Sequence, residues 1–569
     1  MRKKKTKILF MVPMHISLED FISPPENARS IKKEDGKYYN SLPSDLPLGI
    51  LSMSAYLKKF EDVEVKLIDF NVELNWAKGF AYASFYEYCY EFLQNYDFKP
   101  DIVGISSLFS PSFHNFMDLG KASKLIFKDA MIIGGGNIPT NSYEHIYEEL
   151  GCEDFDAFAY GEGEKILLEL IQAEDKEIYL QESRSWITKA KTAKDADFFV
   201  PKHDFIEDLD EIPFYDYDLV NFERHGLNPV MSSYAVVENQ NGFHIMTSRG
   251  CPFMCTFCAS HKVHGRDMRY HSIERVREDF RRLKAHYGAS TIIFQDDHLM
   301  GDPKRVYKIL EEIGDLKLEA VFQNGLTLFS LTKKMLNAFY AAGVRQLVLP
   351  VESGSEKVLK EQMRKPLRFA ISKRVSHDCR ELGIYTNANV LMGMPGETKE
   401  DIEEGLQNLL KMESNWYHVV CASPLVGSEM HDLASAKNYI SGETLGSDYR
   451  IAVINTQEWS SAYIQEKQYL MNLELNFVRN NDIRFKAYSV ALQGLSNVAR
   501  VKEDHCFAYY YMAICYRELQ EYDKAEEAIR NALKYAKMDF WKKYVEYFNL
   551  PLESLDIQEF LKGSLSEVS

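Results

Sequence analysis

The sequence predicts an α/β protein in three parts: a Rossmann-like N-terminal domain over residues 1–180, a central partial (β/α)6 barrel over 239–445, and a C-terminal α-helical domain over 446–569. Two observations carry this prediction. Short apolar runs alternate with amphipathic segments over about the first 175 residues and again from about residue 244 to 430, whereas the tail has few strand signals. A chain of 569 residues is also longer than one hydrophobic core needs.

The N-terminal part contains five apolar runs that are typical of buried parallel strands. They are Lys7–Val12, Val63–Asp69, Asp101–Ser106, Ala130–Gly136 and Asp156–Gly161. Amphipathic segments such as Leu48–Phe60 and Ser142–Leu150 separate these runs and predict crossover helices. Such a doubly wound sheet binds its ligand at the carboxyl ends of the strands. Glycine-rich sequences mark two of those ends, at 134–136 and 161–164.

The central part repeats the alternation six times, after a proline-containing linker over residues 181–238. The expected strands are His244–Arg249, Thr291–Asp296, Ala320–Gln323, Arg345–Val351, Asn387–Gly393 and Tyr417–Ser423. Six βα units make a partial barrel, in which the chemistry is expected in the loops that follow the strands.

The C-terminal part is predicted to be helical, and residues of about 505–537 follow the spacing of a tetratricopeptide (TPR-like) helix pair. One such pair needs neighbours to bury its apolar faces. Two interpretations stay open: a helical cap packed on the barrel, or a groove that recruits a protein partner.

Composition limits the classes of function. The net charge of −17 argues against nucleic-acid binding through the bulk surface. The chain has no run of about 18 apolar residues, so no membrane span is expected. The basic start followed by Ile8–Val12 lacks the features of a signal peptide. Nine cysteines, of which three are clustered, do not form a secreted disulfide framework, and we expect a cytoplasmic protein.

The clustered cysteines, Cys251, Cys255 and Cys258, directly follow a predicted strand with the spacing C-x-x-x-C-x-x-C. Thiolates suit iron–sulfur clusters, and three of them leave one iron of a cubane without a protein ligand. Gly250 permits the tight turn into this loop. The alternative is a structural zinc site in which His261 or His264 supplies a fourth ligand, although no second C-x-x-C pair is present.

This motif, with Phe257 before the last cysteine, resembles that of the radical S-adenosylmethionine superfamily. The resemblance implies that Cys251, Cys255 and Cys258 are catalytic ligands of a [4Fe–4S] cluster, which cleaves S-adenosylmethionine to a 5′-deoxyadenosyl radical. It also implies an electron donor such as flavodoxin or ferredoxin. The cofactors carry the hard chemistry, and the protein orients them and excludes water.

Later strand ends resemble the cofactor-binding segments of that superfamily. Asp296 and Asp297 end the second strand, and a carboxylate there would take an ammonium group. One of the two is expected to cap or orient the loop instead. The remaining residues that the resemblance implies in cofactor binding are Phe257, Asn324 after the third strand, Glu352 and Ser353 in an E-S-G-S sequence, and Gly393 before the turn that meets the adenine.

A Rossmann-like domain ahead of this barrel resembles the cobalamin-binding branch of the superfamily. Gly135, Gly136, Gly161 and Glu162 are the residues expected at the cobalamin, where small residues let the backbone approach a flat ligand. The alternative is tight turns that bind no ligand. The D-x-H-x-x-G cobalamin motif is missing, because Pro13 stands in place of the aspartate before His15. We therefore expect cobalamin without a histidine ligand.

The resemblance favours a class B-like methyltransferase that methylates an unactivated carbon of a small-molecule or natural-product-type substrate through the 5′-deoxyadenosyl radical and methylcobalamin. Rearrangement, oxidation or cyclisation in the same branch is the first alternative. A non-catalytic cobalamin-binding or assembly protein is the second. The three clustered cysteines argue against the second alternative, because a pure binding module has no use for them.

Overall fold

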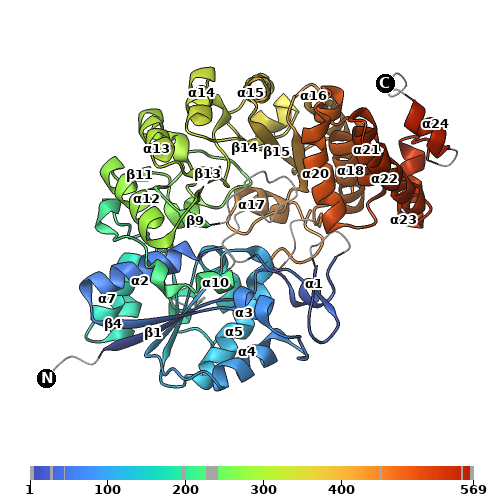
Figure 1. Ribbon diagram of the computed structural model, residues 1–569. Coiled ribbons are helices and arrows are strands. Elements are labelled where there is room, and N and C mark those ends of the chain that lie inside the picture. Colours follow the sequence, from blue (N-terminus) through green and yellow to red (C-terminus); the bar gives the residue numbers. More distant parts are fainter. Residues whose placement is uncertain are drawn as a thin grey trace.

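The computed structural model describes residues 5–25, 30–43, 45–193, 199–225, 241–446, 451–552 and 555–563. The predicted α/β architecture is confirmed: an N-terminal sheet domain lies beneath a barrel of parallel strands, and a group of helices stands beside the barrel (Figure 1). Within these residues, no helix is both long enough and apolar enough to cross a bilayer.

The N-terminal sheet has six strands in the order β4-β1-β5-β6-β7-β8, and every pairing except β7 with β8 is parallel. The predicted count of five strands was wrong by one, because the two-residue β8 lies in the expected linker and is too short to show a periodicity. Residues 226–238 of that linker lie outside the described part of the chain. The strands are β1 (Thr6–Val12), β4 (Val63–Asp69), β5 (Ile102–Ser106), β6 (Met131–Gly135), β7 (Ala157–Ala159) and β8 (Trp186–Ile187).

Helices cover both faces of this sheet, as a doubly wound fold requires. Alternate side chains of β1 point to opposite faces: Ile8, Phe10 and Val12 share a core with α2 and α7, whereas Leu9 and Met11 share one with α3, α4 and α5. The helices are α2 (Leu48–Phe60), α3 (Phe70–Trp76), α4 (Phe85–Gln94), α5 (Phe113–Ile126), α6 (Asn137–Glu144), which continues as a π turn over His145–Glu149, α7 (Glu164–Gln172) and α8 (Lys176–Glu182).

The barrel strands form two three-stranded parallel sheets, β9-β12-β13 and β14-β15-β16, in which all six predicted strands are found. β13 contacts β14, so the two sheets follow one another around the barrel (Figure 1). The strands are β9 (Gly242–Ile245), β12 (Thr291–Phe294), β13 (Glu319–Phe322), β14 (Gln346–Glu352), β15 (Tyr385–Met392) and β16 (Trp416–Cys421). The outer helices are α12 (Ile273–Tyr287), α13 (Pro303–Asp315), α14 (Lys333–Ala341), α15 (Phe369–Leu382) and α16 (Lys399–Leu409), whereas α17 (Glu429–Ala436) lies between the barrel and the N-terminal domain (Figure 1).

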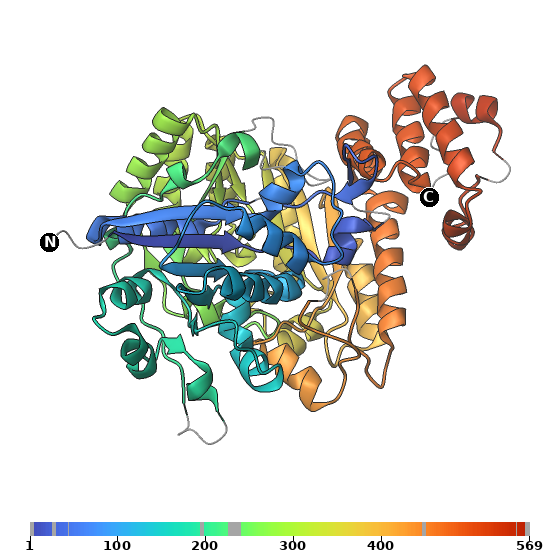
Figure 2. The same ribbon diagram turned by 90° about the horizontal axis from the view of Figure 1, so that it is seen from below.

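The C-terminal helices have their own core and project from the body of the molecule (Figure 2). The expected TPR-like pair is α21 and α22, which contact each other along their length. Barrel residues Tyr385 and Trp416 belong to the same core, which favours the interpretation of a cap packed on the barrel. The helices are α18 (Ser461–Leu473), α19 (Asn481–Arg484), α20 (Tyr488–Val501), α21 (Cys506–Glu518), α22 (Tyr522–Tyr535), α23 (Asp539–Tyr547) and α24 (Ile557–Lys562).

Candidate functional site

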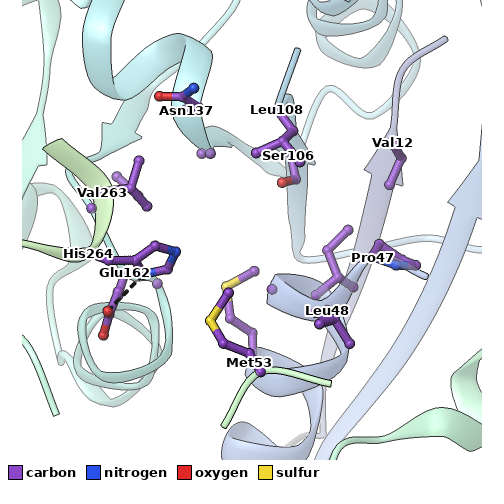
Figure 3. A pocket seen from close by; sticks show the side chains of 18 of the residues that line it. Val12, Pro47, Leu48, Met53, Ser106, Leu108, Asn137, Glu162, Val263 and His264 are labelled. Atoms are coloured by element: carbon purple, nitrogen blue, oxygen red, sulfur yellow. Dashed lines mark hydrogen bonds and ion pairs between the residues drawn. The ribbon is translucent and has the colours of Figure 1, made fainter. Parts of the chain in front are cut away.

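A cavity of about 540 Å³ lies where the carboxyl edge of the N-terminal sheet faces the barrel (Figure 3). This volume is typical of small-molecule and cofactor sites. The N-terminal domain supplies an apolar wall that includes Val12, Pro47, Leu48, Met53 and Leu108. The barrel supplies polar side chains, namely Ser260, His264, Gln295, Asp297, Gln323 and Asn324.

Glycine residues leave the N-terminal wall open to a flat ligand. Gly135, Gly136 and Gly161, all predicted at the cobalamin, line the cavity. A Cβ added at Gly136 (φ +93°) would lie 2.5 Å from the Ser107 carbonyl oxygen, whereas one added at Gly135 would meet its nearest neighbour at 3.8 Å. The contact at position 136 therefore requires glycine, and the three glycines present backbone rather than side chains to the cavity, which suits the close approach of a flat ligand.

His15, which follows β1, also lines the cavity. Its Nδ1 atom is buried and has no hydrogen-bond partner among the described residues. Burial lowers the pKa of His15, so the imidazole is neutral near pH 7. The ring packs edge-on against Phe109 at 4.9 Å between centroids.

Glu162, also predicted at the cobalamin, lines the cavity, but its carboxylate forms ion pairs with side chains of the barrel. Arg249 approaches Oε2 at 2.9 Å, Arg269 approaches Oε1 at 2.5 Å, and His264 Nδ1 lies 2.9 Å from Oε1. Burial alone would raise the pKa of Glu162, but the charges of Arg249, His264 and Arg269 outweigh burial and hold that pKa far below its usual range. The carboxylate is therefore charged in the folded protein.

The three clustered cysteines lie on the loop between β10 (Ser248–Arg249) and β11 (Arg269–Tyr270), which pair antiparallel. We call residues 250–268 the cluster loop. Gly250 has φ +93°, and a Cβ there would collide with the Asp267 carbonyl oxygen, which confirms the predicted tight turn. The Thr256 amide donates to the Met363 carbonyl oxygen at 3.1 Å and anchors the loop to the barrel.

The three thiols are half-buried, and Cys251 and Cys258 are both close enough to Cys255 to influence its pKa. Burial is the main cause that raises the pKa of Cys255 to about 11; Lys365 opposes this shift, and Cys258 and Cys251 add to it. A metal centre that takes thiolate must therefore displace these protons, as iron does. No three His, Cys, Asp or Glu side chains in the described ranges converge as ligands of a single metal ion. His264, the possible fourth zinc ligand, has its Nδ1 beside Glu162 instead.

Asp296 and Asp297 at the end of β12 have different surroundings. Both oxygens of Asp296 accept hydrogen bonds from the Thr247 amide at 3.1 Å, and Oδ1 also accepts from Ser248 Oγ at 2.6 Å. Asp296 therefore fixes the chain just before the cluster loop. Asp297 lines the cavity, and its buried Oδ2 has no hydrogen-bond partner among the described residues. Asn324 lines the cavity as well and donates from Nδ2 to the Gln295 carbonyl oxygen at 2.9 Å.

Glu352, at the end of β14, stands close to the cysteines. It is 8% exposed and has φ +64°, a strained conformation for a residue with a side chain, which is typical of functional sites. Lys365 Nζ lies 3.0 Å from its Oε1 and 6.0 Å from the centre of the Phe257 ring. Glu352 also raises the pKa of Cys255, so these predicted site residues are neighbours. Ser353 Oγ accepts a hydrogen bond from the Ser355 amide at 3.1 Å.

The turn after β15 is organised by a buried carboxyl group. Glu397 Oε2 accepts hydrogen bonds from the amides of Gly393 at 2.6 Å and Met394 at 3.0 Å. Trp459 Nε1 donates to the Glu397 carbonyl oxygen at 2.8 Å. The predicted adenine-binding turn at Gly393 is therefore stabilised by Glu397 within the same turn and by Trp459 in the segment before α18.

Glu397 predicts a pH effect on stability. Burial raises the pKa of Glu397 to about 7, above about 4.3 in an unfolded chain. The folded protein holds this proton more tightly, so the stabilisation present below pH ~4.3 is lost as the pH rises through about 7. Glu397→Gln cannot ionise, and its free energy of unfolding should rise relative to the wild type by up to about 1.4 kcal/mol per pH unit over this window. Chemical unfolding of both proteins between about pH 5 and pH 8 measures this difference, and parallel pH profiles would contradict it.

Several residues of the site were not predicted from the sequence. They are Arg249 and Arg269 at the two ends of the cluster loop, Lys365 beside Glu352, and Glu397. The sequence holds one indication of the arginines' role. Two basic residues flank the predicted metal-binding loop, and two acidic residues, which could pair with them, follow glycines at 161–164. Nothing in the sequence indicates that these segments meet.

Comparisons with known proteins agree with this geometry. The family model of the B12 binding domain matches residues 44–171, and that of the radical SAM superfamily matches residues 245–409. A methyltransferase of Pyrococcus horikoshii is 27% identical over 69% of this chain and 79% of its own length. The cytidylyl-2-hydroxyethylphosphonate methyltransferase of Streptomyces wedmorensis is 26% identical over 76% of this chain and 86% of its own.

A solved structure shares the fold over nearly the whole chain. The cobalamin-dependent S-adenosylmethionine radical enzyme OxsB, with aqua-cobalamin and S-adenosylmethionine bound, superposes with a TM-score of 0.59 at 16% identity, covering 98% of this chain and 83% of its own. The chain therefore contains a domain that matches the radical SAM superfamily over residues 245–409 and one that matches the B12 binding domain over residues 44–171, and it shares the overall fold of OxsB.

Proposed function

We propose that this protein is a cobalamin-dependent radical S-adenosylmethionine methyltransferase that methylates an unactivated carbon of a small-molecule substrate. One observation carries the proposal: the B12-binding domain and the barrel line a single cavity. A ligand on the glycine-rich wall and a ligand at the barrel's strand ends would face the same space, which is the proximity that group transfer requires. The two methyltransferases that match most of the chain support transfer of a methyl group.

The residues fit the cofactors that this function needs. When bound, the cluster and S-adenosylmethionine supply a 5′-deoxyadenosyl radical, and cobalamin supplies the methyl group. Cys251, Cys255 and Cys258 would hold the cluster through thiolates. Gly135, Gly136 and Gly161 would let backbone meet the corrin. We keep His15 as a wall residue rather than a ligand, since its sequence lacks the aspartate that orients such an imidazole.

The S-adenosylmethionine contacts are assigned to the strand ends. Asp297 has an unpartnered buried oxygen that an ammonium group would satisfy, whereas Asp296 positions the chain before the cluster loop. Glu352, beside Cys255 and Phe257, is placed to accept hydrogen bonds from the same ligand. Ser353, Asn324 and the Gly393 turn complete this surface. An electron donor such as flavodoxin or ferredoxin, in a reducing cytoplasm, would serve the cluster.

The products of turnover test the function. After anaerobic purification with reductant and cobalamin, S-adenosylmethionine labelled in its methyl group should give 5′-deoxyadenosine, S-adenosylhomocysteine and a labelled metabolite from extracts of the source cells. 5′-Deoxyadenosine without S-adenosylhomocysteine would contradict methylation and favour rearrangement, oxidation or cyclisation. Neither product would contradict an enzyme and favour a cobalamin-binding or assembly protein.

Gly49 gives a direct test of cobalamin binding. It lies in the first turn of α2 and lines the cavity, and an added Cβ would meet no atom within 4 Å. Gly49→Leu should fill this space and weaken cobalamin binding by about tenfold or more, or roughly 1.4 kcal/mol. The fold should gain stability, because a helical glycine costs about 1 kcal/mol relative to alanine.

Gly49→Ala is the matched control, because it makes the same backbone change with a single added carbon and should keep its cobalamin affinity. Spectrophotometric titration with hydroxocobalamin measures both variants. Equal affinity of the leucine variant and the wild type would place cobalamin elsewhere.

A further inference from the structure

Two arginines face each other at the base of the cluster loop. Arg249 and Arg269 are directly opposite one another in the β10–β11 pair, so they bracket residues 250–268 with all three cysteines between them. Both side chains are buried, at 5% and 4% exposure. Like charges placed directly opposite on neighbouring strands repel, and burial strengthens the repulsion. A carboxylate between the arginines therefore stabilises the base of the loop.

That carboxylate comes from the other domain. Glu162 forms an ion pair with Arg249, whose Nη1 lies 2.9 Å from Oε2, and its two oxygens accept hydrogen bonds from Arg269 Nη1 at 2.9 Å and Nη2 at 2.5 Å. It also pairs with His264, which lies on the far arm of the cluster loop (Figure 3). Among the described residues, Glu164 pairs with Arg249 but not with Arg269, and it accepts a hydrogen bond from Ser52 Oγ. Of these two glutamates, only Glu162 joins both ends of the loop.

The same residue belongs to the wall of the cobalamin cavity. Gly161, Glu162 and Gly163 all line that cavity. Gly161 has φ +86°, and a Cβ there would lie 3.0 Å from the carbonyl oxygen of Val263 in the cluster loop. The backbone of the N-terminal domain is thus in contact with the loop, and a ligand pressed against residues 161–163 would restrict the movement of Glu162.

We propose that Glu162 is a positioning residue for the cluster loop, through which cobalamin and the iron–sulfur cluster stabilise each other's binding. This inference rests on the proposed binding of both cofactors. Each cofactor orders one side of the contact that Glu162 makes with Arg249, Arg269 and His264, so each lowers the cost of ordering the other side. By linkage the effect on the two binding equilibria is reciprocal: the factor by which cobalamin raises the affinity for the cluster equals the factor by which the cluster raises the affinity for cobalamin.

The test measures iron release rather than turnover. Full-length protein is reconstituted with iron and sulfide under anaerobic conditions, and release to an iron chelator is followed with and without saturating hydroxocobalamin. In the wild type, cobalamin should slow release by about tenfold, within the usual range of coupling between sites. In Glu162→Gln, release should be faster and the ratio should fall to about one. Glu164→Gln is the matched control and should keep the wild-type ratio, because Glu162 still bridges both arginines.

A second variant covers a failure of Glu162→Gln to fold. Glu162→Asp keeps the negative charge between the arginines, but its shorter side chain cannot reach Arg249 and Arg269 together, so its ratio should fall between those of the wild type and the glutamine variant. A wild-type ratio in either Glu162 variant, or a ratio of one in the wild type, would overturn the positioning role alone. Failure of the wild type to bind iron or cobalamin, read from metal content and the titration, would overturn the proposed function and this inference with it.

Discussion

Replacement of Cys255 with alanine is expected to remove the iron–sulfur cluster and reduce 5′-deoxyadenosine formation by about a thousandfold or more. Changes to residues that merely orient metal ligands typically cost 10–100-fold, so loss of a ligand should cost more. Cys255 is the middle of the three thiols, and both other thiols influence its pKa. Iron and sulfide content after anaerobic reconstitution, together with the yield of 5′-deoxyadenosine, measure the effect.

Cys421→Ala is the matched control for this change. Cys421 is buried at the end of β16 in the same barrel, at 2% exposure, and belongs to the hydrophobic core. Its replacement removes one buried sulfur atom without touching the cluster loop, so iron content and turnover should stay at the wild-type level. Retention of the cluster and of turnover in Cys255→Ala would reject the assignment of the cysteines as ligands.

Strands and helices could be predicted from the sequence where the pattern within a single segment determines its secondary structure. The predicted range Val63–Asp69 matches β4, and Leu48–Phe60 matches α2, because apolar runs and amphipathic periods reflect burial that the fold then provides. The cysteine motif was equally local, since three cysteines stand within eight residues of one loop. β8 escaped prediction because a two-residue strand carries no periodicity.

The parts of the site that the sequence did not reveal depend on contacts between distant segments. Asp296 and Asp297 are adjacent and chemically alike, and only the fold turns one toward Thr247 and Ser248 and the other into the cavity. Glu162 was assigned to a cofactor through its glycine-rich neighbourhood, but its main partners lie more than 80 residues away in the barrel. Such pairing is set by how two domains dock.

Gly354→Ala is expected to destabilise the protein by about 3 kcal/mol, at the upper end of the usual cost of overpacking. Gly354 follows Glu352 and Ser353, and a Cβ there would lie far inside contact distance of the Gly405 carbonyl oxygen on α16. The clash is with backbone, which cannot rotate away, so the loop itself must move. That movement would shift Glu352 from Lys365, and the KM for S-adenosylmethionine should rise along with the loss of stability.

Gly405→Ala is the matched control, because it adds a methyl group on the other side of the same contact without a backbone clash. Its added Cβ would meet the Ser355 and Gly354 amide nitrogens at 3.7 and 3.8 Å, which is ordinary van der Waals contact. Because Gly405 lies within α16, alanine should stabilise the helix by up to about 1 kcal/mol and leave the KM unchanged. The same contact therefore predicts opposite changes in thermal stability for its two glycines, and a rise in the KM for S-adenosylmethionine in Gly354→Ala alone. Unchanged stability in Gly354→Ala would mean that the loop and α16 are held apart more widely, and Glu352 would then lose its rigid support.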